Sequence, residues 1–412
     1  MNARHLVPLT LLALLPVFAG CSLITKITGV IGGKDNVQPP TPLAKHFTPT
    51  LAVQKLWDAR IGEGPGRSGV RLRPAYAEGK LYVASVNGDL AALDAASGKT
   101  LWRDDTRTQG WFGFGHKRYP DALYAGGPAV SGDLLAVGTL DGHVYGFDAA
   151  TGKQRWAAEL SSEVISASVI DNGTVYARSN DGRIYALDAA NGQRRWVNDQ
   201  ANVPLLSLRG NGPLLVSHGV VFYGSDDGKM VALRGDTGAA QWQQAIAKGE
   251  GRSDIEKLDD ADGGLQLDGD TLYATAYHGS LAAIDAPTGR VDWTRPFSSY
   301  LGVAVAGKQL IGVDDDSVVW AFDAATGGDM WKQEELKYRW LTAPAVLGNY
   351  AVVGDVEGWV HWLDISDGKL AARMRLSRDA IRARPLVVSD TVYIEDIDGH
   401  IGAYRIRSRS NR

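Results

Sequence analysis

The chain has 412 residues, of which 44% are hydrophobic and 22% are charged, and its net charge at pH 7 is −4. A mildly acidic balance argues against a nucleic-acid-binding protein. The chain contains one cysteine, which excludes an intramolecular disulfide framework, and its length is ample for one large core.

The first twenty residues have the features of an export signal. A basic start precedes an apolar run over residues 6–19, which is short for a membrane span. The sequence Phe18-Ala19-Gly20-Cys21 resembles a lipobox, with Phe18 where that motif usually has leucine. We therefore expect residues 1–20 to be removed and Cys21 to carry lipid. Ser22 replaces the aspartate of the inner-membrane retention signal, so the resemblance implies an outer-membrane anchor facing the periplasm.

Residues 21–48 are predicted to form a lipidated flexible tether, because they are rich in glycine, proline and polar side chains. A propeller domain over residues 49–408 is expected to follow. Its first segment, Val53 to Ile61, surrounds Trp57 and is similar to the last strand of each repeat described next.

A unit of the form Asp-Gly-x-hydrophobic-x-Ala-Leu-Asp-Ala-x-Thr-Gly-x-x-x-Trp recurs eight times, in whole or in part. Its tight-turn position is occupied by Gly88, Gly142, Gly182, Gly228, Gly279, Ser317, Gly358 and Gly399, at spacings of 38 to 54 residues. Periods near forty residues with four short strands are typical of propeller blades. The sequence therefore predicts an all-β fold, an eight-bladed β-propeller of four-stranded antiparallel blades.

Local chemistry predicts the strands of each blade. A β-rich run such as residues 81–85 leads into a tight Asn-Gly or Asp-Gly turn, and a longer Asp-Ala-Ala-Thr-Gly turn follows the next strand. A short strand of small residues precedes these three and suits the channel wall, since proline near its start needs no ladder partner. Those prolines are Pro74, Pro128, Pro213, Pro344 and Pro385. The eighth unit lacks its outermost strand, which we expect the N-terminal strand to supply, closing the ring.

Seven tryptophans occupy one repeated position. They are Trp57, Trp102, Trp156, Trp196, Trp242, Trp293 and Trp331. We expect each indole to pack between neighbouring blades, with its N–H bonded to a carbonyl. The alternative is an aromatic cage for a ligand.

Three stretches lengthen the repeat, and insertions in repeat folds are where recognition usually occurs. The first covers residues 106–127 and contains the aromatic group Trp111 to Phe114, whose role is left open. The second covers residues 202–212 and the third residues 245–264. The second places leucines beside Arg209, an apolar knob edged by charge that is typical of a protein contact. The alternative is that these leucines pack against a blade.

Propellers with tryptophan at this position resemble the quinoprotein alcohol dehydrogenases, which hold pyrroloquinoline quinone and calcium. Those enzymes use adjacent cysteines, a carboxylate base and amide or carboxylate calcium ligands, and this chain cannot supply the cysteine pair. The acidic runs at residues 259–263 and 314–316 do not give a complete calcium-ligand set, and no histidine pair has metal spacing. We therefore predict no catalytic residue, no cofactor and no metal.

A second resemblance is more specific. Residues 206–210 (LSLRG) and residues 251–262 (GRSDIEKLDDAD) resemble the paired segments of the BamB family, lipoproteins of the outer-membrane β-barrel assembly machinery. In that family the two loops dock on the periplasmic POTRA domains of BamA, the barrel-forming subunit. The resemblance places Leu206, Leu208 and Arg209 on the first loop of the docking patch, and Asp260 and Asp262 on the second.

The resemblance implies a non-enzymatic scaffold, anchored by lipid to the periplasmic face of the outer membrane, that helps to fold and insert outer-membrane proteins. Its implied partners are BamA, the other subunits reached through BamA, and unfolded outer-membrane proteins. The alternative function is that of a periplasmic quinone-dependent dehydrogenase or a small-ligand-binding propeller that uses the central channel.

Overall fold

The computed structural model describes residues 38–66, 70, 72–105, 123–199, 212–247, 261 and 263–407. The chain from Pro40 onward forms one compact unit, distinct from residues 1–39. Regular structure in the described residues consists of strands. Within those residues, no helix is long and apolar enough to span a membrane.

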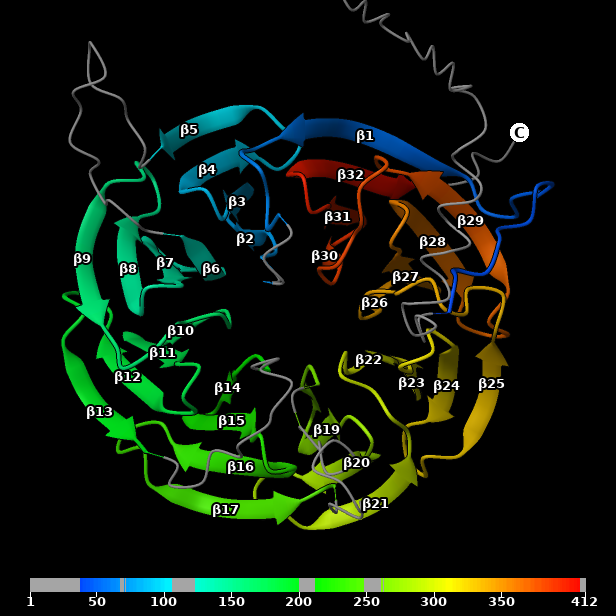
Figure 1. The fold of residues 1–412 in the computed structure, drawn as a ribbon. Coiled ribbons are helices and arrows are strands. Elements are labelled where there is room, and N and C mark those ends of the chain that lie inside the picture. Colours follow the sequence, from blue (N-terminus) through cyan, green and yellow to red (C-terminus); the bar gives the residue numbers. More distant parts are fainter. Residues whose placement is uncertain are drawn as a thin grey trace, which may run out of the picture. The chain divides into compact units, whose positions relative to one another are not determined.

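Eight four-stranded antiparallel sheets form the blades of a ring (Figure 1). Blades 1 to 4 consist of β2 (Ala75–Ala77), β3 (Lys80–Ala84), β4 (Asp89–Asp94) and β5 (Thr100–Asp105); β6 (Tyr124–Ser131), β7 (Leu134–Thr139), β8 (His143–Asp148) and β9 (Gln154–Glu159); β10 (Val169–Asp171), β11 (Thr174–Arg178), β12 (Ile184–Asp188) and β13 (Arg194–Asn198); and β14 (Leu215–Ser217), β15 (Val220–Gly224), β16 (Lys229–Arg234) and β17 (Ala240–Ala245).

Blades 5 to 8 consist of β18 (Gln266–Asp268), β19 (Thr271–Thr275), β20 (Ser280–Asp285) and β21 (Val291–Pro296); β22 (Val303–Ala306), β23 (Gln309–Val313), β24 (Val319–Asp323) and β25 (Asp329–Gln333); β26 (Ala345–Leu347), β27 (Tyr350–Gly354), β28 (Trp359–Asp364) and β29 (Leu370–Arg375); and β30 (Leu386–Val388), β31 (Thr391–Glu395), β32 (His400–Ile406) and β1 (Val53–Arg60). The predicted eight-bladed propeller is confirmed.

The N-terminal strand closes the ring, as predicted. β1 pairs antiparallel with β32, from Val53 opposite Ile406 to Arg60 opposite His400. The Trp57 indole N–H on β1 donates to the Ala95 carbonyl of blade 1 at 3.0 Å. The last blade is thus completed by the start of the propeller, which leaves no blade with an unpaired third strand.

The core lies between the blades, and this explains the burial pattern of the strands. The second and third strands of a blade face neighbours on both sides, so β4 and β11 are buried along nearly their whole length. The outermost strand has one face toward solvent, and β17 and β21 alternate between exposed and half-buried residues. The innermost strand is usually only three residues long, because eight strands crowd around the channel (Figure 1).

The repeated tryptophans join neighbouring blades, as predicted. Each indole N–H donates to a carbonyl in the turn between the third and fourth strands of the next blade, at 2.8 to 3.2 Å. The pairs are Trp57 with Ala95, Trp102 with Ala149, Trp156 with Ala189, Trp196 with Gly235, Trp242 with Ala286, Trp293 with Ala324 and Trp331 with Ile365. The same turn carries a glycine in the left-handed conformation, and a methyl group there would lie 2.4 to 2.7 Å from the ring. The indoles therefore pack directly on the backbone of the next blade.

Blade 7 has Ala372 in place of the tryptophan. Its contact with blade 8 uses Trp362 of β28 instead, which is fully buried and meets Tyr404 of β32 edge-on, with ring centroids 5.8 Å apart. Because an aromatic side chain from another strand fills this interface, the ring tolerates the lost repeat residue.

The first insertion ends earlier than expected. The sequence assigned residues 106–127 to it, but β6 begins at Tyr124, which pairs with Thr139. Tyr124 is 1% exposed and meets Phe147 edge-on, with centroids 6.3 Å apart. Burial of this aromatic ring extends the inner strand of blade 2 into residues that composition alone suggested were a surface loop.

Candidate partner-binding face

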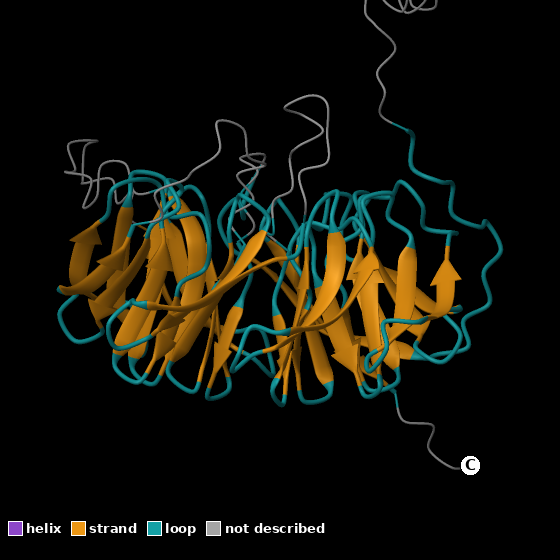
Figure 2. Ribbon diagram, turned by 90° about the horizontal axis from the view of Figure 1, so that it is seen from below, coloured by secondary structure: helices purple, strands orange, loops and turns teal. Residues whose placement is uncertain are grey.

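All connections between blades leave from one face of the ring. In a four-stranded antiparallel meander, the turn between the second and third strands lies at the same end as the exit of the fourth strand. We call this side the connecting face and define it by turns such as Asn87–Gly88, Asp141–Gly142 and Asp227–Gly228. Figure 2 shows the strands running between two opposite faces of turns. The exiting chain bonds to these turns repeatedly: the amides of Leu160, Ile246, Phe297 and Leu376 donate to Gly142, Gly228, Gly279 and Gly358.

The residues predicted to bind a partner lie outside the described residues. This applies to Leu206, Leu208 and Arg209, to Asp260 and Asp262, and also to Cys21 and the aromatic group at residues 111–114. The structure does describe where the two predicted docking loops begin and end. The first joins β13 of blade 3 to β14 of blade 4, and the second joins β17 of blade 4 to β18 of blade 5. Both therefore start and finish on the connecting face, one on each side of blade 4.

The first loop connects blade 3 to blade 4, and a buried ion pair joins the same two blades on the connecting face. Arg178 is the last residue of β11, and its Nη2 lies 2.5 Å from Oδ1 of Asp226 in the tight turn of blade 4. The side chains are 1% and 8% exposed. The same guanidinium donates to the Gly224 carbonyl at 2.9 Å and lies over the Tyr223 ring at 5.9 Å. Removing one member of such a pair leaves a buried charge uncompensated, so this contact fixes blade 4 against blade 3.

The second loop is anchored in the apolar core between blades 4 and 5. Ile246 and Ala247 at its start are 5% and 8% exposed, and Ala261 near its end is fully buried. Their backbone amides donate to the tight turn of blade 4: Ile246 and Ala247 to the Gly228 carbonyl at 3.0 and 3.2 Å, and Ala261 to the Ser225 carbonyl at 3.3 Å. Both ends of this loop are thus held by a single turn, residues 225–228.

Gly224 links the two loop anchors. Its carbonyl accepts the Arg178 hydrogen bond, while a methyl group on its α-carbon would lie 1.7 Å from the Ala261 carbonyl oxygen. Only glycine lets the backbone of the second loop pass this close to β15. Arg178 and Gly224 were missed as functional residues in the sequence. Aligning the last position of each second strand that pairs with the third strand marks Arg178, because that position is charged only there and at Glu395. It does not mark Gly224, because Gly138 and Gly354 occupy the same position.

Charged groups of blade 3 border the same region. Asp181, in the tight turn of blade 3, accepts hydrogen bonds from Ser161 and Ser179 and pairs with Arg183 at 2.5 Å. Burial alone would raise the pKa of Asp181, but these hydrogen bonds and the Arg183 charge outweigh it and lower the pKa. Arg183 also pairs with Asp199 at 3.1 Å, immediately before the first loop. Asp181 at the border of the site is therefore ionised at neutral pH.

A second buried cluster lies on the connecting face of blade 7. Arg339 donates to Asp355 at 2.7 Å and to the Thr41 carbonyl at 2.7 Å, and it also pairs with Glu357. His361, fully buried, approaches the Asp355 carboxylate at 2.9 Å through Nε2. Burial lowers the pKa of His361, so its ring is neutral at pH 7. Burial opposes ionisation of Asp355, but the His361 hydrogen bond and the Arg339 charge lower its pKa.

Blade 7 also holds the segment that precedes the propeller, through Arg339 of this cluster and through Arg373 and Ala371 of β29. Besides the Thr41 carbonyl, the Ala44 carbonyl accepts a hydrogen bond from Arg373 at 2.7 Å, and Phe47 lies under the same guanidinium at 5.2 Å. The amides of Thr50 and Leu51 then donate to the Ala371 carbonyl. The last part of the predicted tether therefore lies against blade 7.

One group of described residues has ligand atoms close enough to share a metal ion: Asp379, Asp398 and His400. Protein partners already hold two of them, because Asp398 pairs with Arg60 at 2.7 Å and His400 Nδ1 lies 3.0 Å from Asp396. These contacts account for the cluster without an ion.

Comparison with known proteins shows which family carries this architecture. The family model for outer membrane protein assembly factor BamB matches residues 53–113, 115–333 and 315–411. The chain belongs to the BamB family. It is 41% identical to the BamB assembly factor of Xanthomonas campestris pv. campestris, over 94% of each chain, and 31% identical to that of Escherichia coli K12, over 93% of this chain and 95% of the relative. Both relatives are thus matched over nearly their full length.

Solved structures show the same fold. The crystal structure of BamB from Moraxella catarrhalis aligns with a TM-score of 0.76 at 27% identity, covering 86% of this chain and all of that one. The quinohemoprotein alcohol dehydrogenase of Comamonas testosteroni aligns with a TM-score of 0.63 at 14% identity, covering 87% of this chain and 78% of that one. The second likeness concerns the fold alone and says nothing about dehydrogenase chemistry in this chain.

Proposed function

We propose that this chain is a non-enzymatic assembly factor for outer-membrane proteins, anchored by lipid on Cys21 at the periplasmic face of the outer membrane. In this proposal it docks on the POTRA domains of BamA through the two loops that flank blade 4. Leu206 and Leu208 are the apolar anchors, Arg209 pairs with a carboxylate of the partner, and Asp260 and Asp262 complete the patch.

The observation that carries this proposal is the common support of the two loops. Both loops adjoin blade 4: the first ends at its inner strand β14, and the second is held at both ends by its tight turn, which the buried Arg178–Asp226 pair ties to blade 3. Loops on a rigid support lose less conformational entropy on binding than unsupported ones, because their ends are already fixed. Membership of the BamB family supports the same assignment.

The mechanism we propose is positional. A lipid anchor and a protein interface hold the chain at two points, so the second contact forms at a high effective concentration once the first is made. A propeller held in this way fixes the orientation of the partner's POTRA arm beside the membrane. Unfolded outer-membrane proteins then meet a POTRA arm that adopts fewer conformations.

The test is co-purification with BamA from intact envelopes. The double variant Leu208→Ala/Arg209→Glu removes one apolar anchor and reverses the charge that pairs with the partner, so we expect at least a tenfold loss of BamA recovered with the chain. The matched control is Leu101→Ala/Lys308→Glu. Leu101 is an exposed leucine on an outer strand, and Lys308 is exposed on the opposite face of the ring.

Co-purification at the wild-type level by a folded Leu208→Ala/Arg209→Glu variant would exclude this docking site. Equal loss in the control variant would also count against it, because the effect would then not be specific to the loops. A thermal melt of each purified variant distinguishes either result from loss of the fold.

A further inference from the structure

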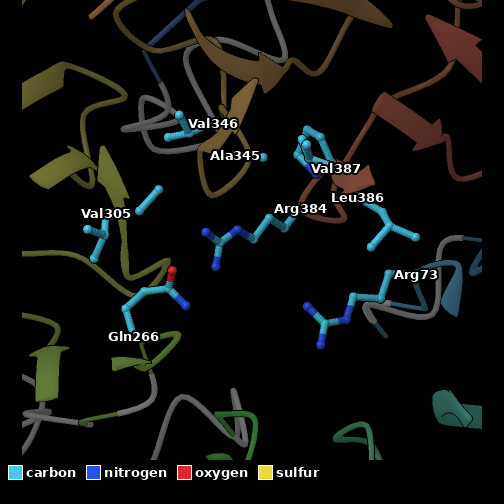
Figure 3. A pocket seen from close by; sticks show the side chains of 10 residues that line it. Arg73, Gln266, Val305, Ala345, Val346, Arg384, Leu386 and Val387 are labelled. Atoms are coloured by element: carbon cyan, nitrogen blue, oxygen red, sulfur yellow. The ribbon is translucent and has the colours of Figure 1, made fainter. Parts of the chain in front are cut away.

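The central channel contains a cavity of about 360 Å³ that the proposed docking function does not use. Its wall includes Gln266 of blade 5, Val305 of blade 6, Val346 of blade 7 and Arg384 and Leu386 of blade 8, with Arg73 of blade 1 beside them. Figure 3 shows the Arg73 and Arg384 guanidinium groups reaching into the same opening, with the Gln266 amide across from them. Its volume lies in the range of small-molecule sites, about 300–1,000 Å³.

The two arginines break a pattern of small residues around the channel. The turn that ends each inner strand aligns eight positions, each four residues before the last residue of that strand. In blades 1 to 8 these are Arg73, Gly127, Ala167, Pro213, Gly264, Gly302, Ala343 and Arg384. Six of the eight are small, which leaves the channel open. The long cationic side chains occur only on blades 8 and 1, which are neighbours because β1 completes blade 8 and bonds to blade 1.

Among the residues that the structure describes, no acidic side chain lines this cavity. Within the described part of the chain, neither Arg73 nor Arg384 has a hydrogen bond or an ion pair to another side chain. Channel water reaches both guanidiniums, yet protein surrounds them, and burial lowers the pKa of Arg73. Burial and the Arg73 charge lower the pKa of Arg384 to about 10, still far above neutral pH. Two partly desolvated positive charges therefore face the same space in a protein whose net charge is −4.

We infer that the channel binds a small oxyanion, a soluble molecule with phosphate or carboxylate groups, between Arg73 and Arg384. Guanidinium groups bind such oxyanions through paired, charge-assisted hydrogen bonds. An anion here offsets the repulsion between the two arginines, and the Gln266 amide opposite can donate to a second polar group of the ligand. The small residues at the other six positions leave space in the channel for such a ligand. This inference concerns a site on the channel axis and is independent of docking through blade 4.

The test is calorimetric titration of the purified full-length protein in non-ionic detergent with citrate and with inorganic phosphate, at constant ionic strength set with chloride. Saturable binding of at least one of the two is expected. Each arginine that is removed should weaken it about tenfold, the effect of losing a charge-assisted hydrogen bond. The double variant Arg73→Ala/Arg384→Ala should therefore show no measurable heat. Arg382→Ala is the matched control, because Arg382 is an exposed arginine two residues away and should change the affinity less than twofold.

Two results would overturn the inference: no saturable binding of either anion to the wild-type protein, or the same affinity in Arg73→Ala/Arg384→Ala as in the wild type. A third arm compares flotation with vesicles of phosphatidylglycerol and of phosphatidylcholine. The protein could float with phosphatidylglycerol vesicles and not with phosphatidylcholine vesicles, in a way that needs both arginines, while binding neither citrate nor phosphate. That result would assign the site to lipid headgroups and refute a soluble ligand. If the alanine pair does not fold, Arg73→Lys and Arg384→Lys should each weaken binding while Arg382→Lys does not. Co-purification with BamA should be unchanged in all of them.

Discussion

Substitution of Glu395 by glutamine should stabilise the propeller increasingly as the pH rises. Glu395 is the last residue of β31 and is 3% exposed. Neither of its carboxylate oxygens has a hydrogen-bond partner among the described residues. Burial, together with the neighbouring Asp396, raises the pKa of Glu395 well above the ordinary value of 4.5. The folded protein therefore keeps a proton on this carboxyl at a pH where the unfolded chain has lost it.

The magnitude follows from proton linkage. Because the folded pKa is raised, the folded state binds more protons than the unfolded state between the two pKa values. The free energy of unfolding of the wild type therefore falls as the pH rises through this window, by up to about 1.4 kcal/mol per pH unit. Glutamine does not titrate, so the variant lacks this loss. The stability difference between Glu395→Gln and the wild type should be smallest near pH 4 and grow from there. It should level off at the folded pKa of Glu395.

The assay is urea denaturation followed by tryptophan fluorescence at several pH values between 4 and 8. Burying an amide instead of a carboxyl adds a pH-independent constant to the difference in unfolding free energy between the variant and the wild type. The test is therefore the slope of this difference with pH and not its absolute value. Glu159→Gln, at an exposed glutamate on β9, controls for the loss of one carboxylate. A difference between Glu395→Gln and the wild type that is flat or decreases with pH would refute the reasoning.

Three further changes test how the ring is joined. Arg178→Met should lower the free energy of unfolding by about 3–5 kcal/mol in urea melts, since it leaves a buried carboxylate without its cation, whereas Arg234→Met at the exposed pair with Asp236 should leave the urea midpoint unchanged. Trp196→Phe should cost about 1 kcal/mol through the lost hydrogen bond and Trp196→Ala about 3 kcal/mol through the lost ring, and equal melting temperatures would contradict the packing described above. Gly238→Ala should destabilise by about 1–3 kcal/mol more than Gly219→Ala: both glycines have a φ near +70°, but only Gly238 packs on an indole. Comparable losses for the two would show that backbone strain alone is responsible.

The architecture could be predicted from the sequence because each unit repeats the same local chemistry. A tight turn, a longer Asp-to-Gly turn and a tryptophan recur in order, and each has a short-range cause. The role of the tryptophans followed from their spacing alone. Where the repeat decays, prediction fails: Tyr124 extends β6 because a tertiary contact with Phe147 buries it, and no local pattern around residue 124 shows that contact.

The support beneath the candidate site was harder to find in the sequence. The family resemblance singled out Leu208 and Arg209, which the described residues do not include, but nothing local marked Arg178 or Gly224. Arg178 reaches a turn 48 residues away, and the need for glycine at position 224 arises only when the end of the second loop lies across it. Arg178 becomes visible once the blades are aligned, because six of the other blades hold an uncharged residue at that position. Gly224 does not, because Gly138 and Gly354 occupy the same position in their blades.

Paired and unpaired charges of the described residues lie in different parts of the ring. Buried ion pairs occur where one blade must be fixed against another, as between Arg178 and Asp226, and there each charge has a partner. The channel instead holds Arg73 and Arg384, which have no side-chain partner within the described part of the chain. A buried pair adds little net stability compared with apolar packing but strongly disfavours misaligned arrangements, which suits the support of the two loops that flank blade 4. Two unpaired cations in one cavity weaken the fold unless an anion joins them. If Arg73→Ala/Arg384→Ala raises the melting temperature in the absence of oxyanions, these arginines reduce stability, and ligand binding is the reason that best accounts for them.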